Sequence, residues 1–202
     1  MADFVMITYF LSLTLLFFFG SSGFVMIYEY FKHRNKQDEK LPELNEFPPV
    51  TIQLPLYNER YVAERVIEAT CNIAYLPENL EIQVLDDSTD DTVEVVAEVV
   101  KKYQEKAFDI KHIHRKNRQG YKAGALKEGL AVARGEFVAI FDADFIPKPD
   151  FLLKTLPYFL SNPKIGMVQT RWEHLNSDYS LLTRTQAMAL DGHFVIEQNV
   201  RN

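Results

Sequence analysis

The segment FVAIFDAD, at residues 137–144, is the strongest indication of the fold in this sequence. Its first five residues form a short, continuous apolar run, which is typical of a strand buried on both faces of a parallel sheet. Two carboxylates, Asp142 and Asp144, follow directly and lie one residue apart. A turn can bring both to one hard cation, because Mg²⁺ and Mn²⁺ prefer oxygen ligands and leave room for phosphate groups. Such a triplet is also common in solvated turns, so its position after a buried strand is what favours a metal site.

Strand and helix patterns alternate on both sides of this stretch. Apolar runs predict further strands at residues 50–54, 82–85, 110–114 and 165–170. Helical spacing predicts helices near residues 62–73, 93–103, 123–130 and 151–160, with Asp150 as the N-cap of the last. This alternation indicates an α/β fold with a mostly parallel sheet flanked by helices. Ligands in such sheets bind beyond the carboxyl ends of the strands, so polar clusters that follow strands are the candidate site.

A second carboxylate pair, Asp86 and Asp87, follows the strand at 82–85. Residues 88–90, Ser-Thr-Asp, can cap the next helix, but capping does not explain the two preceding carboxylates. Adjacent carboxylates at a strand end repel each other unless a donor-rich ligand or a cation lies between them. The pair is therefore a candidate binding element.

A basic loop, RKNRQG at residues 115–120, follows the strand at 110–114 and opens a helix. Gly120 and Gly124 permit close approach of the backbone. Lys122 is expected near a helix N-terminus, where anions are favoured, so the loop predicts a phosphate contact. A solvated surface loop is the alternative.

Two aromatic residues near strand ends are further candidates. In PLYNE, residues 55–59, Tyr57 can pack on a flat base, and Glu59 can hydrogen-bond it. Asn58 is expected to cap the following helix. Trp172 is the only Trp, and stacking on a sugar ring and packing in the core remain open for it.

The N-terminal region predicts a membrane anchor. Residues 4–28 contain no Asp, Glu, Lys or Arg, and these 25 residues exceed the about 20 that span a bilayer. No basic segment precedes the run, which disfavours a cleaved signal peptide. Every Lys and Arg lies after it, so the positive-inside rule predicts a cytoplasmic domain. The predicted parts are an anchor at 1–31, a linker at 32–49 and an α/β domain at 50–202.

Composition excludes some classes of protein. The net charge of −6 argues against a general nucleic-acid binder, which would carry a basic excess. The single Cys71 cannot form an intramolecular disulfide.

The pattern of residues 178–200 predicts one long helix with an apolar stripe. Packing of this helix on the sheet and binding of it at the membrane surface remain open.

From residue 48 to residue 200 the chain resembles the inverting family 2 glycosyltransferases, which have the Rossmann-like GT-A fold. Within that family it is most similar to the cellulose synthase-like, glucomannan 4-beta-mannosyltransferase-like (CslA-type) group. The segments that carry the resemblance are PLYNE (55–59), QVLDDSTD (83–90), NRQGYKAGALKEG (117–129), IFDADF (140–145) and VQTRW (168–172).

The resemblance implies a role for each candidate residue. Asp87, together with Asp86, would bind the nucleotide base, and Tyr57 and Glu59 would line the base and ribose pocket. Lys122 would contact the diphosphate. Asp142 would bind the ribose and, with Asp144, the Mg²⁺ or Mn²⁺ that holds the diphosphate. The reaction implied is transfer of a hexose from GDP-mannose or UDP-glucose to a growing β-glycan, at a bacterial inner membrane or a Golgi-type membrane.

The chain also departs from the family pattern. The family's Thr-Glu-Asp-type base motif and Gln-x-x-Arg-Trp motif are absent, and residues 169–172 are one residue too short for the latter. No catalytic residue can therefore be named, and the 202-residue chain is expected to bind the donor weakly or not at all and not to turn over alone. One alternative is a non-catalytic membrane partner that keeps the fold. A nucleotidyltransferase is a further alternative, disfavoured because residues 55–58 lack the glycine of its phosphate loop.

Overall fold

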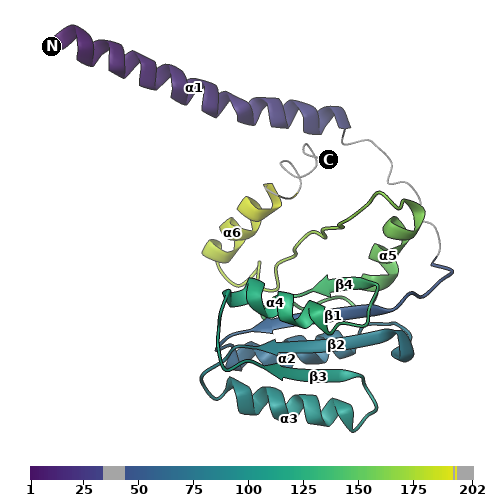
Figure 1. The fold of residues 1–202 in the computed structure, drawn as a ribbon. Helices are drawn as coiled ribbons and strands as arrows, with labels where there is room; N and C mark the ends of the chain where they lie inside the picture. Colours follow the sequence, from purple (N-terminus) through teal and green to yellow (C-terminus); the bar gives the residue numbers. More distant parts are fainter. Residues whose placement is uncertain (34–43, 193, 195–202) are drawn as a thin grey trace. The chain divides into compact units, whose positions relative to one another are not determined.

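The computed structural model describes residues 1–33, 44–192 and 194 (Figure 1). The chain divides into two compact units. One unit, residues 41–168, contains the sheet and is called the sheet unit below. The other combines residues 1–40 with residues 169–202 and is called the terminal unit. The predicted linker at 32–49 lies largely outside the described residues, so the boundaries 1–31, 32–49 and 50–202 stay predictions.

The sheet unit is built on four parallel strands in the order β3-β2-β1-β4. The strands are β1 (Val50–Leu56), β2 (Leu80–Asp86), β3 (Ile110–His114) and β4 (Phe137–Ile140). Four of the five strands predicted from apolar runs are therefore confirmed, as is the parallel α/β arrangement.

Four helices connect and cover these strands (Figure 1). They are α2 (Arg60–Cys71), α3 (Thr92–Gln104), α4 (Tyr121–Ala131) and α5 (Phe151–Ser161), and a short 3₁₀ turn, η1 (Pro77–Asn79), precedes β2. Asp150 stands at the N-cap position of α5 but makes no capping bond. Its carboxylate instead pairs with Lys154 Nζ at 2.5 Å. The predicted N-cap residue is therefore correct by position, but it does not form the capping hydrogen bond.

One face of the sheet is apolar. Ile52, Leu54, Ile82 and Val84 are fully buried and belong to one core with apolar side chains of α2 and α3. The helices contribute residues at helical spacing, namely Ala63, Val66, Ile67, Val96, Val99 and Val100. Each fully buried Val, Leu or Ile stabilises the fold by about 1.5–3 kcal/mol. This face therefore anchors the strands whose ends carry the candidate site.

The opposite face of β1 and β2 is polar although it is buried. Thr51 Oγ1 donates to Glu81 Oε2 at 2.7 Å, and Gln53 Nε2 donates to Gln83 Oε1 at 3.0 Å. α4 lies on this face, because a Cβ at its Gly129 would come within 2.9 Å of both glutamine side chains. These cross-strand bonds satisfy groups that would otherwise be costly to bury.

The fifth predicted strand, at residues 165–170, is wrong. No helix or strand is present at residues 162–180. Met167 is 78% exposed, and nothing lies within 4 Å of where a Cβ of Gly166 would be. A strand needs a neighbouring ladder for its backbone hydrogen bonds, and in the described part of the chain this segment has none.

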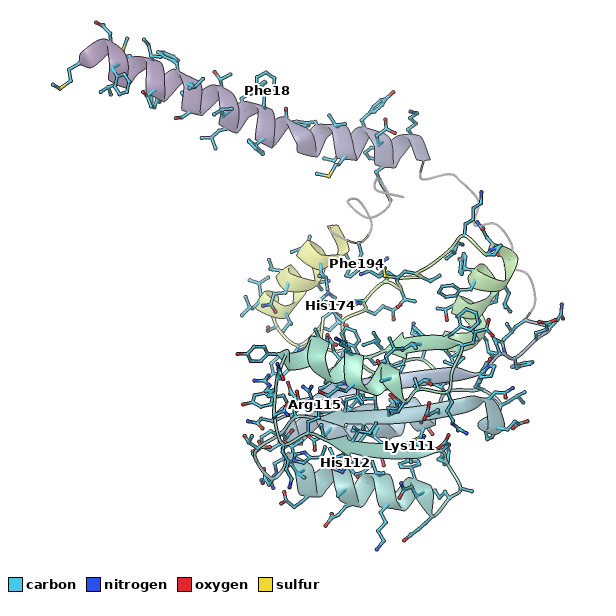
Figure 2. The ribbon with its side chains drawn as sticks, in the orientation of Figure 1. Phe18, Lys111, His112, Arg115, His174 and Phe194 are labelled. Carbon is cyan, nitrogen blue, oxygen red and sulfur yellow. The ribbon has the colours of Figure 1, made fainter. Side chains whose placement is uncertain are left out.

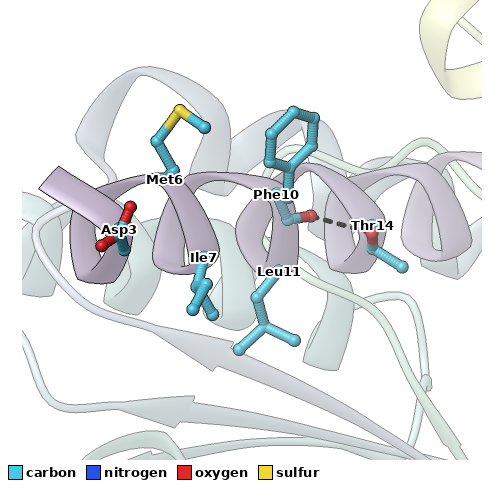
Figure 3. A pocket seen from close by; sticks show the side chains of 6 residues that line it. All are labelled: Asp3, Met6, Ile7, Phe10, Leu11 and Thr14. Atoms are coloured by element: carbon cyan, nitrogen blue, oxygen red, sulfur yellow. Dashed lines mark hydrogen bonds between the residues drawn. The ribbon is translucent and has the colours of Figure 1, made fainter.

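The terminal unit contains α1 (Ala2–His33) and α6 (Leu181–Gly192). Among the described residues, α1 is the one helix long and apolar enough to cross a membrane. A shallow hollow on it is lined by residues of α1 alone, where Thr14 Oγ1 donates to the Phe10 carbonyl at 2.8 Å (Figure 3). A hollow formed by one exposed helix encloses no ligand, so it is not a candidate site.

The helix predicted at residues 178–200 begins later than expected. α6 starts at Leu181, after Ser180 and Thr183 exchange backbone-to-side-chain hydrogen bonds of 2.9 and 3.1 Å. Residue 193 and residues 195–202 lie outside the described residues. Leu181, Leu182 and Met188, which belong to the predicted apolar stripe, are exposed. Trp172 packs against Phe194, with ring centroids 5.5 Å apart, and is 43% exposed.

Candidate functional site

The carboxyl ends of the four parallel strands bring four loops to one edge of the sheet unit. The strand register pairs Leu56 with Asp86 and Asp86 with His114. The Phe141 amide donates to the Gln53 carbonyl at 3.2 Å, which places residues 142–144 beside β1. The predicted site residues of the PLYNE, QVLDDSTD, basic and FDAD segments therefore meet at one edge, as the strand order requires.

Asp87 is held by a buried ion pair. Arg115 Nε and Nη2 donate to the two Asp87 carboxylate oxygens at 2.7 and 2.6 Å, and both side chains are about 5% exposed. Arg115 Nη1 also donates to Glu128 Oε1 at 2.8 Å. The hydrogen bonds to Asp87 raise the pKa of Arg115, so the guanidinium stays charged in spite of its burial. This two-point geometry fixes the loop after β2 to the loop after β3.

Asp86 is fully buried and also partnered. Its Oδ1 accepts the Ser88 backbone N–H at 2.8 Å, and His112 Nε2 lies 2.8 Å from its Oδ2. Burial alone would raise the pKa of this carboxyl, but the hydrogen bonds from His112 and Ser88 outweigh burial and lower it. Both carboxylates of the pair are therefore satisfied by the protein itself.

Asn58 does not cap α2, contrary to the sequence-based expectation. It has a positive φ of 55°, and the N-cap position of α2 belongs to Glu59, which makes no capping bond. The Asn58 backbone N–H donates to Ser88 Oγ at 2.9 Å, and the Asn58 side-chain Oδ1 accepts the Thr89 N–H at 2.9 Å. The left-handed backbone turns Asn58 toward the loop after β2, so it links two loops of the site. Asp90 does supply a bond at the start of α3, where its Oδ1 accepts the Thr92 N–H at 3.0 Å.

Tyr57 is exposed at the site edge and carries an arginine on its ring. The Arg118 guanidinium carbon lies 3.2 Å from the Tyr57 ring centroid and 5.1 Å from that of Tyr121. Glu59 is exposed beside Tyr57 in the sequence. Sequence reasoning did not single out Arg118, although it lies inside the basic loop. A cationic plane between two aromatic rings makes this part of the site suited to stacking.

Lys122 and Asp142 form an ion pair. The sequence predicted a role for each residue but not their contact. The Lys122 Nζ donates to Asp142 Oδ1, and both side chains are about half exposed. Lys122 lies in the first turn of α4, after Gly120 with a left-handed φ of 74°. A Cβ at Gly124 would come 2.0 Å from the Gln119 carbonyl oxygen, so only glycine permits this tight start of the helix.

The residues 142–144 fit a divalent cation. Ala143 is buried, whereas Asp142 is partly exposed and Asp144 is exposed, so the two carboxylates flank an inward-facing residue. Carboxylate oxygens are the ligands that Mg²⁺ and Mn²⁺ prefer. The neighbouring Lys122 ammonium adds a positive charge suited to phosphate oxygens.

Two histidines at the same edge were missed by sequence reasoning. His112 Nε2 and His114 Nδ1 lie 2.8 and 3.6 Å from Asp86 Oδ2 (Figure 2 labels His112). The signal was available in the sequence, because residues 112 and 114 of one strand point to the same face.

Comparison with known proteins shows the family to which this sequence is related. Residues 51–200 match the family described as glycosyl transferase family 2. The chain is 50% identical over 167 residues to glucomannan 4-beta-mannosyltransferase 2 of Arabidopsis thaliana, covering 81% of this chain and 31% of that protein. It is 48% identical over 166 residues to glucomannan 4-beta-mannosyltransferase 1 of Cyamopsis tetragonoloba, covering 80% and 32%. The chain thus spans about a third of the length of the curated relatives it matches.

Solved structures share the fold. The mannosyltransferase PcManGT from Pyrobaculum calidifontis, solved with GDP-Man and Mn²⁺, superposes with a TM-score of 0.63 at 27% identity, covering 75% of this chain and 46% of that one. TarS residues 1–349 from S. aureus superpose with a TM-score of 0.50 at 20% identity, covering 62% and 40%, which bears on the fold alone.

Proposed function

Because this chain belongs to glycosyl transferase family 2, we propose that its sheet unit binds a nucleotide-diphosphate sugar, whose hexose is transferred to a growing β-glycan. The observation that carries the proposal is the contact between Lys122 and Asp142, beside the exposed Asp144. It brings a cation suited to phosphate and two carboxylates suited to a metal to the same strand edge.

In this proposal Asp142 and Asp144 hold Mg²⁺ or Mn²⁺, and Asp142 also contacts the ribose. The divalent cation would offset the negative charge of the leaving nucleotide diphosphate. Lys122 releases Asp142 when the donor binds and turns its ammonium to a phosphate oxygen. The ion pair is exposed, and exposed pairs contribute about 0–1 kcal/mol, so the exchange costs little.

The base and ribose are assigned to Tyr57, Glu59, Asp86 and Asp87. Tyr57 and the Arg118 guanidinium that lies over its ring form a partly exposed, flat surface for stacking. Asp87 already accepts two hydrogen bonds from Arg115, and a carboxylate has about four acceptor positions, so capacity remains for a base N–H. Asp86 is fully buried, so its part in this pocket would be to hold the loop after β2 through the Ser88 N–H.

GDP-mannose is the proposed donor, and UDP-glucose is the alternative. PcManGT was solved with GDP-Man and Mn²⁺, and the two plant relatives are named mannosyltransferases. The acceptor is proposed to be the glycan chain. No general base is assigned within these 202 residues, so the proposal concerns donor binding first.

Membrane attachment through α1 is part of the proposal. The helix is long and apolar enough to span a bilayer, and the basic residues of the chain follow its apolar run. The positive-inside rule then puts the sheet unit on the cytoplasmic side of a bacterial inner membrane or a Golgi-type membrane. The exposed apolar side chains of α6 are compatible with contact at the membrane surface.

Calorimetric titration of the detergent-solubilised chain with GDP and with UDP, with and without Mn²⁺, tests the proposal. We expect Mn²⁺-dependent binding that favours GDP and is lost in an Asp142→Ala, Asp144→Ala double variant. A Glu94→Ala, Glu98→Ala double variant removes the same charge from exposed positions of α3 and should bind as the unchanged chain does. Binding of neither nucleotide would contradict the proposal and favour a non-catalytic partner. Equal binding by both double variants would contradict the assignment of the metal to Asp142 and Asp144.

A further inference from the structure

The edge strand β3 presents two imidazoles to one buried carboxylate. His112 and His114 are two residues apart, so both lie on the same face of the sheet. The β2–β3 register pairs Val84 with His112 and Asp86 with His114, which puts Asp86 on that face as well. The three ligand atoms, one from each side chain, lie within 4.8 Å of one another.

The carboxylate is oriented toward the imidazoles by its other oxygen. Asp86 Oδ1 accepts the Ser88 N–H at 2.8 Å, so Oδ2 is the oxygen that faces His112 and His114. Ser88 is itself fixed, because its Oγ accepts a hydrogen bond from the Asn58 backbone N–H at 2.9 Å. Such outer hydrogen bonds hold a metal-binding carboxylate in a fixed orientation before the ion arrives.

The spacing suits a small transition-metal ion. Zn²⁺ binds imidazole and carboxylate at about 2.0–2.2 Å, so ligand atoms of a tetrahedral site lie about 3.3 Å apart. The distances from Asp86 Oδ2 to His112 Nε2 and His114 Nδ1, 2.8 and 3.6 Å, lie on either side of that value. The more distant ligand, His114, is also the more exposed, at 36% of its side chain against 17% for His112.

We propose that Asp86, His112 and His114 form a second metal site that binds a Zn²⁺-class transition-metal ion. Two imidazoles and one carboxylate favour Zn²⁺ over Mg²⁺, whereas the oxygen-only pair Asp142 and Asp144 has the opposite preference. Three protein ligands leave a fourth position for water. The partly exposed histidines supply the path by which the ion enters. This inference does not depend on the donor-binding proposal.

Cobalt(II) absorption in the visible range and equilibrium dialysis with Zn²⁺ test the site on the full chain, purified in detergent without a histidine tag. We expect one Zn²⁺ per chain and a Co²⁺ spectrum typical of four-coordination. His114→Gln and His112→Gln should each weaken Zn²⁺ binding at least about tenfold, by comparison with the 10–100-fold effects of lost outer ligands.

Two controls separate this site from others on the chain. His33→Gln, at the end of α1, should leave Zn²⁺ binding unchanged, and so should the Asp142→Asn, Asp144→Asn double variant. His112 contacts the buried Asp86, so circular dichroism must show that His112→Gln is folded. If His112→Gln unfolds, the variant at the more exposed position, His114→Gln, decides the test alone. Absence of the Co²⁺ spectrum, or Zn²⁺ binding retained in His114→Gln, would overturn the proposal and leave the cluster as a hydrogen-bonded one.

Discussion

Two pairs of carboxylates stand at the ends of parallel strands in this protein, and the protein treats them differently. Asp86 and Asp87 lie at the end of β2 and are buried. Asp86 is hydrogen-bonded to Ser88 and His112, and Asp87 accepts hydrogen bonds from Arg115. Asp142 and Asp144 follow β4 and are partly or fully exposed, with Asp142 paired to the half-exposed Lys122.

Position after a strand does not by itself decide whether a carboxylate pair is buried or exposed. β2 lies inside the sheet, and the loop after β3 covers its end with Arg115. β4 is an edge strand, and its end is open to solvent. A buried charge must be paired by the protein, whereas an exposed pair can be offered to a cation. We therefore expect loss of the first pair to lower stability most, and loss of the second pair to abolish binding of the Mg²⁺ or Mn²⁺ that holds the diphosphate.

The largest effect is expected from breaking the buried pair. Arg115→Met keeps the apolar length of the side chain but leaves the Asp87 carboxylate buried without its two hydrogen bonds. Removal of one partner of a buried pair costs about 3–5 kcal/mol, and we expect a fall of that size in the free energy of unfolding. Chemical denaturation measures it.

The matched control acts on the exposed pair. Lys122→Met removes the cation that contacts Asp142, and exposed pairs contribute about 0–1 kcal/mol. The two methionine variants should therefore differ several-fold in their effect on unfolding. Equal losses in both would show that the two pairs do not differ in the way proposed here.

A loss of stability smaller than that of Arg115→Met is expected at Gly124, which lies in the tight start of α4 beside Lys122. In Gly124→Ala the new Cβ would meet the Gln119 carbonyl oxygen at 2.0 Å, so the start of α4 must shift. Overpacking of this kind typically costs about 1–3 kcal/mol. Thermal unfolding of this variant should show a lowered midpoint, beside Gly166→Ala, where nothing lies within 4 Å of the new Cβ. A midpoint as high as that of Gly166→Ala would argue against a tight turn.

A third buried carboxylate, Glu81, extends the comparison to pH. Burial opposes its ionisation, but hydrogen bonds from Lys111 at 2.5 Å, the Arg134 N–H at 2.8 Å and Thr51 at 2.7 Å lower its pKa. A lowered folded-state pKa gives stability that is present above the unfolded pKa of about 4.3 and is lost as pH falls through the folded value.

Glu81→Gln should therefore be less stable than the unchanged chain at pH 7, and the difference should shrink as pH falls below about 4. Unfolding midpoints between pH 7 and pH 3 measure this difference. Glu78→Gln, at an exposed position of η1, should match the unchanged chain at pH 7. A stability difference that stays constant across this range would show that Glu81 acts through packing and not through its charge.

The strands and helices of the sheet unit could be predicted from sequence because their signals are local. An apolar run or a 3.6-residue spacing is visible within one segment, and the four strands and four helices of the sheet unit occur where such patterns predict them. The segment at 165–170 has a similar pattern but no neighbouring ladder, and the presence of a partner cannot be seen in a local pattern.

Pairings between distant residues could not be predicted in the same way. Asp87 and Arg115 are 28 positions apart, and their contact depends on the order β3-β2. Asn58 was expected to bond locally, and instead it bonds 30 positions away to Ser88. Sequence reasoning therefore found the strand ends that carry the site, whereas the division of labour between the two carboxylate pairs came from the structure.

The most direct test of that division is electron paramagnetic resonance of Mn²⁺ in the presence of GDP, with the free-ion signal measured for the unchanged chain and for Asp142→Asn, Asp144→Asn. We predict that the unchanged chain reduces the free Mn²⁺ signal at one ion per chain. The double variant should leave the signal at the level set by GDP alone, although its unfolding free energy is unchanged. Equal Mn²⁺ binding by both proteins, or unfolding of the double variant, would show that Asp142 and Asp144 are not an exposed metal-binding pair.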